Sequence, residues 1–383
     1  MTATILSMSL LTVMAGAAIA PALGIIKAHF SEASAMTVQL IVSMPALLII
    51  VTSLLFLPIS RVLRTRTIAT TGLLLYVIAG AGCFFMNDIY LLLTMRALLG
   101  VSVGLIMPLS TGLLAYYFPP EEQARLMGLS AAMNQMGGVV ATLLAGLLST
   151  IEWNYAFLVY LLGMIALVMV WIWLPDEQLG SANKRGVQFQ PRQLLKFHPS
   201  VIGMLLLMTI FFIFPTNFAI LASQRQGLST EVITGIMVGL DVVAFFVGLK
   251  FGSLMNRFRQ SVKYFAPLLF LLGYGSYLVP TLIMAVLGSA FIGMATGVGV
   301  PYLNTIASIK GGKNSATTVM PLLSAALYLG QFISPLIVTP LSKVIFGSTD
   351  IVAPYEVGIV LCVIFLLQVY STRHFQSLPP TVK

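Results

Sequence analysis

Twelve long apolar runs, separated by short polar loops, constrain this chain more than any other feature of its sequence. A bilayer core of about 30 Å is crossed by roughly 20 apolar helical residues, and only helices or closed barrels satisfy the whole backbone in lipid. The runs are too long and too uniformly apolar for the alternating strands of a barrel. The sequence therefore predicts an all-α integral membrane protein with these approximate spans: 4–26, 37–58, 68–86, 90–117, 126–149, 155–174, 200–222, 232–252, 264–281, 283–308, 316–341 and 353–371.

The composition agrees with a membrane protein and not with a soluble domain. Of the 383 residues, 58% are hydrophobic and only 8% are charged, which is too few charges to cover a soluble surface. The net charge of +9 comes from basic residues scattered over short loops without interleaved aromatic side chains, which argues against nucleic-acid binding. Cys83 and Cys362 both lie in apolar runs, so we expect buried thiols and no disulfide framework.

The basic loop residues orient the predicted spans. With both termini in the cytoplasm, all of these residues except Lys27, Arg225 and Lys343 fall on the cytoplasmic side. This distribution follows the positive-inside rule and requires an even number of spans. The first run lacks the basic segment and the cleavage site of a signal peptide, so we expect it to remain as the first span of a multi-pass protein in the cytoplasmic (inner) membrane.

Two parts of the chain carry the same pattern of small residues, which lie on one stripe of a helix. The copies, 193 residues apart, are Arg96-x3-Gly100-x3-Gly104-x3-Pro108 and Ser289-x3-Gly293-x3-Gly297-x3-Pro301. Ser60-Arg61 and Asn256-Arg257 form a second pair, 196 residues apart. We therefore expect a duplicated helical unit, as secondary transporters use for alternating access, with the glycines and prolines serving helix packing and gating.

The longest polar segment separates the two copies. It runs from Pro175 to Pro199 and falls between the sixth and seventh predicted spans. We therefore predict two pseudo-symmetric six-helix bundles at residues 1–174 and 200–383, joined by a cytoplasmic linker at residues 175–199.

This organisation resembles the major facilitator superfamily, and several motifs agree. The loop after the second span reads FLPISRVLR at residues 56–64 and its second copy reads GSLMNR at residues 252–257, similar to the family's loop signature without its aspartate. The Arg-x3-Gly pattern at Arg96 is similar to that of proton-coupled members, and Gly128 to Gly138 resembles the glycine-rich signature of antiporters. The strings APAL at residues 20–23 and WNYAF at residues 153–157 resemble the bacterial drug:proton antiporter branch. The resemblance implies a monomeric, proton-driven carrier of a small molecule that needs no cofactor.

Two charged residues lie inside predicted spans and differ between the copies. Asp241 is about nine residues into the eighth span and, at an offset of 196, takes the place of Pro45. A buried carboxylate is costly and marks a proton or substrate path, but it can also be a hydrogen-bonded structural acid. Arg96, which takes the place of Ser289, is either a counter-charge for Asp241 or for an anionic substrate, or a side chain that extends outward to Asp88.

Other candidate residues carry weaker expectations. The resemblance implies that Arg61, Arg257 and Asn256 form a cytoplasmic gate, although positive-inside charge alone also explains the arginines. Six polar residues are candidates for a substrate cavity or, alternatively, for interhelical hydrogen bonds: Asn134, Gln135, Asn217, Asn304, Tyr328 and Gln331. The prolines of FPTN at residues 214–217 and GQFISP at residues 330–335 predict broken helices.

Three classes of function remain open. The first is a proton-coupled exporter of small amphipathic compounds, and the second is a proton-coupled uptake symporter for an organic anion, a nucleoside or a similar metabolite. The third, a membrane enzyme or channel, has the least support. The segment GGKNS at residues 311–315 lacks the glycine and the hydroxyl positions of a phosphate-binding loop, and the sequence has no metal-binding motif, so we expect neither a metal nor ATP-driven pumping.

Overall fold

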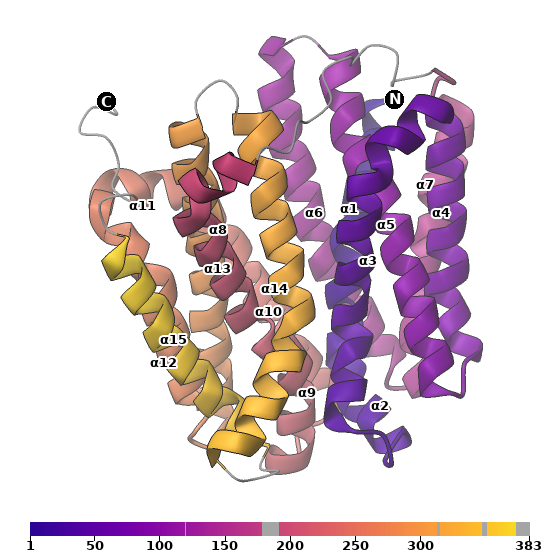
Figure 1. The fold of residues 1–383 in the computed structure, drawn as a ribbon. Helices are drawn as coiled ribbons and strands as arrows, with labels where there is room; N and C mark the ends of the chain where they lie inside the picture. The colour runs from indigo at the N-terminus through magenta and orange to yellow at the C-terminus, as the bar shows by residue number, and fades with distance from the viewer. Residues whose placement is uncertain (119, 178–190, 312–314, 347–350, 373–383) are drawn as a thin grey trace. The chain divides into compact units, whose positions relative to one another are not determined.

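The structure, a computed structural model, describes residues 1–118, 120–177, 191–311, 315–346 and 351–372 (Figure 1). Helices are the only regular secondary structure in these residues. Contacts between helices divide the chain into two compact units. The first unit contains Met1–Gly186 and Ser229–Thr234, and the second contains Val187–Leu228 and Gly235–Lys383.

In the first unit the helices follow one another with short connections (Figure 1). They are α1 (Thr2–Ala17), η1 (Ala20–Ala22), α2 (Leu23–His29), α3 (Ala35–Val62), α4 (Thr65–Gly82), η2 (Cys83–Phe85), α5 (Ile89–Tyr117), α6 (Pro120–Leu148), η3 (Trp153–Leu162) and α7 (Gly163–Trp173), where η marks a 3₁₀ helix. Helix α5 packs against α1, α3 and α4, so it is the centre of this unit.

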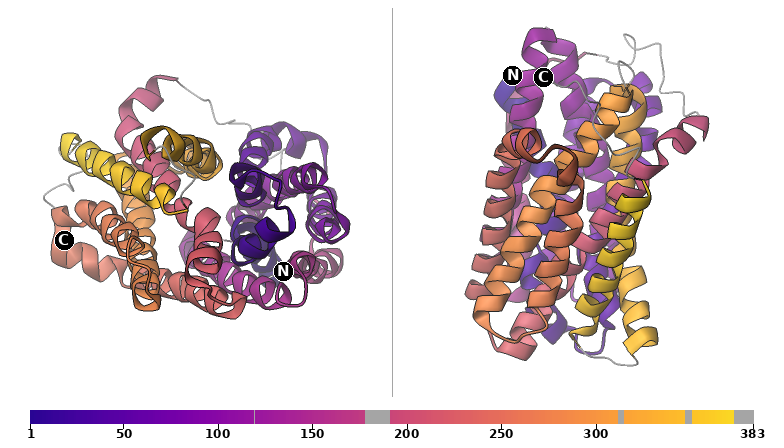
Figure 2. Two further views of the ribbon diagram at one scale, coloured as in Figure 1. Left: turned by 90° about the horizontal axis from the view of Figure 1, so that it is seen from below. Right: turned by 90° about the vertical axis from the view of Figure 1, so that its left-hand side faces the viewer.

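The second unit is also built of helices joined by short connections, and these are coloured from pink through orange to yellow in Figure 2. Its helices are α8 (Pro191–Phe211), α9 (Ile213–Gln226), α10 (Thr230–Leu249), α11 (Phe251–Phe258), η5 (Arg259–Tyr264), α12 (Phe265–Ser276), α13 (Leu282–Gly311), α14 (Ser315–Phe346) and α15 (Ala353–Ser371). The first residues of α10, up to Thr234, group with the first unit.

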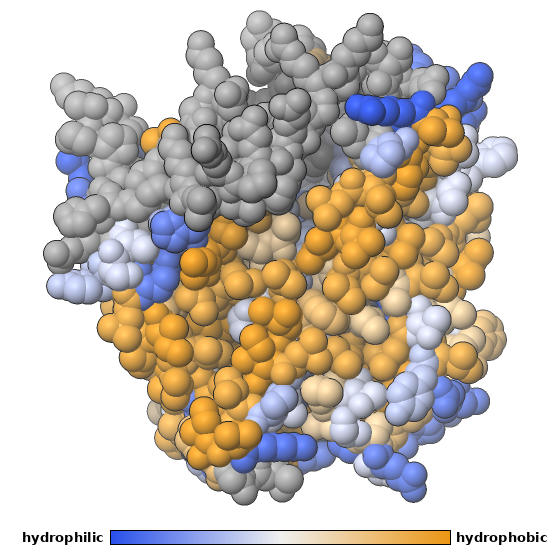
Figure 3. All heavy atoms as spheres, viewed as in Figure 1, coloured by the Kyte–Doolittle hydropathy of each residue, from blue (hydrophilic) through white to orange (hydrophobic). Residues whose placement is uncertain are grey.

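Helices occupy all twelve of the ranges predicted as spans. Among the described residues, ten helical segments are long and apolar enough to cross a membrane. The other two ranges fall short because the apolar part of α6 covers only Ala132–Leu148 and α12 has 12 residues. On the face in Figure 3, apolar side chains cover the middle of the helices and hydrophilic ones lie near their ends. An all-α membrane protein is therefore confirmed, and the number of twelve crossings stays a prediction.

The repeated glycines lie at equivalent helix contacts in the two units. A β-carbon added to Gly100 of α5 would collide with the Pro45 carbonyl of α3, and one added to Gly293 of α13 would lie 2.5 Å from the Leu240 carbonyl oxygen of α10. One turn further on, a β-carbon on Gly104 would lie 3.0 Å from the Ile49 carbonyl oxygen, and one on Gly297 would lie 2.7 Å from that of Ala244. Only glycine permits such close backbone approach.

These contacts correct the alignment of the two copies by one residue. Because Gly100 meets Pro45 and Gly293 meets Leu240, Pro45 corresponds to Leu240. The sequence alignment paired Pro45 with Asp241, which instead corresponds to Ala46. The loop motifs used for that alignment lie at the ends of α3 and α11, beyond the interruption of the second unit's helix at Lys250. They therefore need not share the register of the buried helix contacts.

The predicted helix breaks are confirmed in one place and wrong in another. Helices α8 and α9 are interrupted at Phe212, three residues before Pro215. By contrast, α14 continues through Pro335, so the break predicted at residues 330–335 is wrong. A proline removes one helical hydrogen bond, and packing against α8 holds this helix together: the Ser334 hydroxyl donates to the Thr209 carbonyl at 2.7 Å.

We predict that Gly100→Ala destabilises the protein by about 1–3 kcal/mol, because the new methyl group overpacks the contact with α3. Gly112→Ala in the same helix is the matched control, since a β-carbon there meets nothing within 4 Å. Thermal unfolding in detergent should give a lower Tm for Gly100→Ala and an unchanged or higher Tm for Gly112→Ala. Equal Tm values for the two variants would contradict the close contact.

Candidate functional site

The first helix of the first unit is interrupted, which leaves backbone acceptors to be satisfied. Helix α1 ends at Ala17, and η1 with Pro21 separates it from α2. The last carbonyls of a helix have no N–H partner within it. Near this end, the Ala18 N–H donates to the Met14 carbonyl at 3.3 Å, and among the described residues no backbone N–H beyond the helix donates to the Ala15 carbonyl.

Arg96 of α5 supplies that donor. Its side chain is 0% exposed, and each nitrogen of its guanidinium donates one hydrogen bond. Nη2 donates to the Ala15 carbonyl, Nε donates to the Ile41 carbonyl of α3 at 2.6 Å, and Nη1 donates to the Tyr160 hydroxyl of η3 at 2.6 Å. Arg96 therefore links four helical segments of the first unit.

Two tyrosines complete this cluster. The Tyr160 hydroxyl accepts from Arg96 and donates toward the carbonyls of Met14 at 3.3 Å and Ala15 at 3.4 Å. The Tyr76 hydroxyl donates to the Leu11 carbonyl at 3.2 Å, and its ring packs edge-on against that of Tyr160 with 5.6 Å between centroids. Every hydrogen-bonding group of α1 contacted here is a backbone carbonyl.

The surroundings explain how a full positive charge is held in the protein interior. A buried charge is costly unless hydrogen bonds satisfy it, and bonds from a charged donor stabilise by about 1.5–3 kcal/mol each. The guanidinium also lies at the C-terminal end of α1, where the helix dipole favours a cation. These contacts differ from the predicted outward extension to Asp88, whose carboxylate instead caps α5 by accepting from the N–H groups of Tyr90 and Leu91.

The second unit fills the equivalent place with neutral groups. Ser289, at the position of Arg96, shares a 2.7 Å hydrogen bond with the Tyr277 hydroxyl. Tyr355 corresponds to Tyr160, because three residues after each of them a glycine (Gly163 and Gly358) meets a tyrosine ring, Tyr76 and Tyr274 respectively. Tyr355 packs against Tyr277 with 4.9 Å between ring centroids. The Tyr355 side chain is buried, yet its hydroxyl has no hydrogen-bond partner among the described residues. Near the interruption of α8 and α9, the Tyr274 hydroxyl donates to the Ile210 carbonyl.

Asp241, the other charged residue predicted for proton coupling, lies in the middle of α10 and is half-buried. It follows Leu240, the residue that meets Gly293 of α13. Every other described acidic residue lies in a loop or in the first turn of a helix. Arg96 belongs to the first unit and Asp241 to the second. The alternative in which Arg96 is the counter-charge of Asp241 stays untested.

The residues predicted for the cavity fall in both units and differ in their hydrogen bonds. In the first unit, the Asn134 side-chain oxygen accepts from Thr12 of α1 at 3.0 Å, and Gln135 is exposed. In the second unit, the Asn217 amide nitrogen donates to the Ile213 carbonyl of its own helix at 2.9 Å. Asn304 and Tyr328 are half-buried and Gln331 is buried. The protein itself therefore satisfies part of the polarity of Asn134 and Asn217.

The residues predicted for the gate are all exposed. Arg61 lies in the last turn of α3, and Asn256 and Arg257 lie in α11. The Arg257 guanidinium lies over the Phe258 ring, 5.8 Å from its centroid. Sequence reasoning missed a neighbouring ion pair, in which Arg64 donates to the Asp176 carboxylate at 2.9 Å and joins the start of α4 to the end of α7. The pair is largely exposed, so it contributes at most about 1 kcal/mol.

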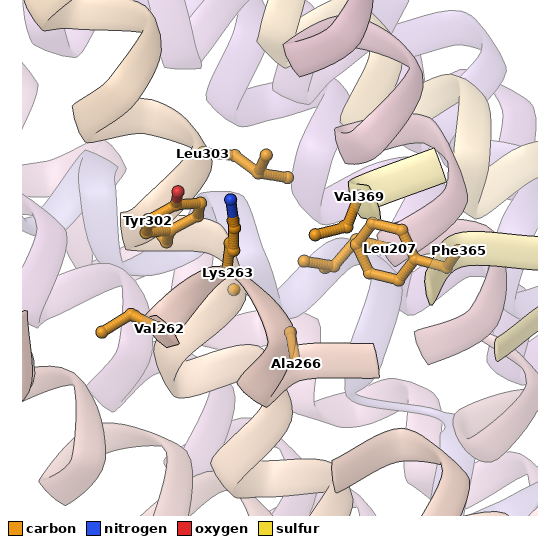
Figure 4. A pocket seen from close by; sticks show the side chains of 9 residues that line it. Leu207, Val262, Lys263, Ala266, Tyr302, Leu303, Phe365 and Val369 are labelled. Atoms are coloured by element: carbon orange, nitrogen blue, oxygen red, sulfur yellow. The ribbon is translucent and has the colours of Figure 1, made fainter. Parts of the chain in front are cut away.

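A small pocket in the second unit contains none of the predicted cavity residues (Figure 4). Lys263, only 7% exposed, points into it between Tyr302 and Leu303, and the rest of the lining is apolar. The Lys263 amine also lies 5.2 Å from the centre of the Tyr264 ring. Among the described residues, no group of three His, Cys, Asp or Glu side chains is arranged to hold a metal ion.

Residues 5–335 match the family model of the Major Facilitator Superfamily. The chain belongs to this superfamily. It is therefore a multi-pass membrane transporter and not an enzyme, as the motifs around Arg96 and in the loop at residues 252–257 predicted.

The curated relatives of this superfamily member are distant. Quinolone resistance protein NorA of Staphylococcus aureus (strain MRSA252) is 24% identical over 302 residues, which cover 72% of this chain and 73% of NorA. A probable chloroplastic anion transporter of Arabidopsis thaliana is 31% identical over only 87 residues, or 22% of this chain and 16% of that protein.

Solved structures agree with the superfamily fold over nearly the whole chain. A bacterial homolog of the human lysosomal transporter Spinster has a TM-score of 0.74 at 16% identity and covers 99% of this chain and 98% of its own. The nucleoside transporter NupG has a TM-score of 0.77 at 11% identity and covers 99% of both chains. The D-xylose-proton symporter has a TM-score of 0.71 at 15% identity, covering 95% and 96%. At these identities the likeness shows the fold alone.

The partners of Arg96 were missed by sequence reasoning because most of them are backbone atoms. The superfamily pattern singled out Arg96 and its glycines, but it says nothing about the carbonyls of Ala15 and Ile41. Two prolines were the available signal: Pro21 follows the end of α1, and Pro45 lies four residues after Ile41.

We predict that Tyr160→Phe lowers the stability by about 1–3 kcal/mol, because it leaves Nη1 of the buried Arg96 without its acceptor. Tyr355→Phe is the matched control in the other unit, since its hydroxyl has no hydrogen bond to lose among the described residues. Thermal unfolding of the two purified variants should separate them by several degrees. The assignment fails if Tyr355→Phe is as damaging as Tyr160→Phe.

Proposed function

We propose that this chain exports small amphipathic compounds from the cytoplasm in exchange for protons. The observation that carries the proposal is the position of Asp241. It is the one acidic side chain among the described residues that lies well inside a helix long and apolar enough to span a membrane. Ionisable residues at such depth are expensive and mark ion or proton paths.

A carboxyl group in this position suits a proton carrier. It binds a proton as a neutral acid in an apolar surrounding and releases it when water reaches it from the other side. Alternating access to one site supplies that change of surroundings. Asp241 then takes up a proton from one side of the membrane and gives it up to the other, while the substrate moves in the opposite direction.

The direction and the substrate class rest on two further observations. NorA, a quinolone resistance protein, is related over 72% of this chain, which supports export. Among the predicted cavity residues, Asn134 and Asn217 already use side-chain hydrogen-bonding groups within the protein. The commitment of these two side chains to the scaffold supports compounds recognised by shape and apolar contact.

The proposal includes the arrangement expected from the sequence. The chain forms two six-helix bundles with twelve crossings of the cytoplasmic membrane, both termini lie in the cytoplasm, and the protein acts as a monomer. Arg61, Arg257 and Asn256 close the cytoplasmic side in one state. The second candidate is uptake with protons, since the same fold also occurs in a D-xylose-proton symporter and in the nucleoside transporter NupG and therefore does not fix the direction.

We predict that Asp241→Asn reduces transport driven by a pH gradient at least tenfold and leaves expression and Tm unchanged, because an amide fills the same space but carries no proton. The assay is uptake of a cationic dye into proteoliposomes under an imposed pH gradient. Glu356→Gln, in the first turn of α15, is the control and should keep the wild-type rate.

The same assay decides the direction of transport. Dye that moves against the proton flow supports exchange, and dye that moves with the protons supports the uptake symporter instead. Full pH-driven transport by Asp241→Asn would remove Asp241 from the mechanism.

A further inference from the structure

We propose that Pro45 and Arg96 form a matched pair, in which the guanidinium supplies the hydrogen-bond donors that are missing at the end of α1 and at the proline of α3, and thereby positions the end of α1 for transport. Arg96 is then a positioning residue. This role is independent of the direction of transport and of the function proposed for Asp241.

The first step concerns α3. In an α-helix the N–H of residue 45 would donate to the carbonyl of residue 41. Pro45 has no N–H, so the Ile41 carbonyl loses its helical donor inside an apolar span. The Arg96 Nε donates to this carbonyl at 2.6 Å and replaces the missing bond.

The second step concerns α1. Ala15 lies in the last turn before the interruption, where carbonyls have no helical donor. The Arg96 Nη2 donates to the Ala15 carbonyl, and the Tyr160 hydroxyl that Arg96 holds also faces it. Water that would satisfy such groups in a soluble protein is absent from a bilayer, so a protein donor must do so.

The third step is an internal comparison. In the second unit the position of Pro45 is Leu240, which has an N–H and leaves no carbonyl without a donor. The position of Arg96 there is Ser289, whose hydroxyl bonds the Tyr277 hydroxyl and the Ala285 carbonyl of its own helix, and the hydroxyl of Tyr355 is left without a partner among the described residues. Proline and arginine therefore occur together in one copy and are both replaced in the other.

The geometry requires arginine in particular. A guanidinium carries donors on three nitrogens in a fixed planar arrangement. Here the three nitrogens serve α3, η3 and α1 at the same time. A substitution that removes them leaves the end of α1 bonded in this cluster only by the longer hydrogen bonds from the Tyr160 hydroxyl to the Met14 and Ala15 carbonyls.

The test is a double-mutant cycle of the full-length protein that combines Arg96→Ser with Pro45→Ala, which restores an N–H at residue 45. We expect Arg96→Ser to lower the rate of pH-driven dye transport at least tenfold when Pro45 is present and no more than about threefold when it is combined with Pro45→Ala. The restored N–H satisfies the Ile41 carbonyl and so relieves part of the loss, and the remaining loss reflects the Ala15 carbonyl, which still lacks the Arg96 donor. The apparent KM and the shape of the pH profile should stay those of the wild type, because the change affects the position of α1 and not the proton carrier.

Pro58→Ala is the matched control, because Pro58 lies in the same helix and frees a different carbonyl, that of Leu54. It should give no relief from Arg96→Ser. If Arg96→Ser does not accumulate as folded protein, recovery of a folded, monodisperse protein by Pro45→Ala but not by Pro58→Ala is the same result. The same double-mutant cycle can be calculated from the Tm values even if no dye is transported. Failure of the proposed function is therefore distinguished from failure of the proposed Pro45–Arg96 pair.

Additive effects of Arg96→Ser and Pro45→Ala overturn the proposal, as does equal relief by Pro58→Ala. A shifted pH profile of Arg96→Ser with and without Pro45→Ala also overturns it, because that result assigns Arg96 to proton transfer. A lower Tm without any loss of transport rate shows that Arg96 stabilises the fold only and overturns its positioning role.

Discussion

The hydrogen bonds from the buried Arg96 guanidinium to the carbonyls of Ala15 and Ile41 hold together the helices on which the first unit depends. In lipid each unsatisfied backbone group costs several kcal/mol, so a transporter that interrupts its helices must supply donors from elsewhere. Arg96 does this at the contact of α1, α3 and α5, where the glycines of α5 also bring the backbones together. Close packing and backbone satisfaction are thus achieved by one helix, α5.

The two units reach the same packing with different chemistry. Glycines at equivalent positions meet carbonyls of α3 and α10, but the second unit closes its core with the hydroxyls of Tyr274, Tyr277 and Ser289 instead of a cation. The corrected register places Asp241 beside Leu240, the counterpart of Pro45. Each unit therefore carries one charge near the same helix contact, a cation on α5 in the first and an acid on α10 in the second. The two copies of the scaffold therefore share their helix packing but differ in the charge that they carry near this contact.

Much of the fold was predictable because it depends on composition and period. Apolar runs predicted the helices, and the glycine spacing predicted a close-packing stripe on α5 and α13, although not the helices that it meets. The environment of Arg96 was not predictable, because its partners are carbonyls of residues with ordinary apolar side chains and a tyrosine 64 residues away. The sequence alignment of the two copies was wrong by one residue for a similar reason. It was based on the exposed loop arginines, whereas the buried contact between Gly293 and Leu240 determines the register of the helices. The break expected at Pro335 failed because neighbouring helices decide whether a proline interrupts a helix.

The hydrogen bonds that polar side chains already make within the protein also limit what the transporter can recognise. Ser9 with Ser130 and Thr12 with Asn134 join α1 to α6 by side-chain hydrogen bonds, and Asn217 bonds within its own helix. A site for a sugar or nucleoside needs several convergent polar groups. A ligand hydroxyl that finds no hydrogen-bond partner in a dry cavity loses its bonds to water without compensation. Polar groups committed to the scaffold cannot serve that purpose without breaking it. These commitments support the proposal of amphipathic ligands that are held by shape and apolar contact.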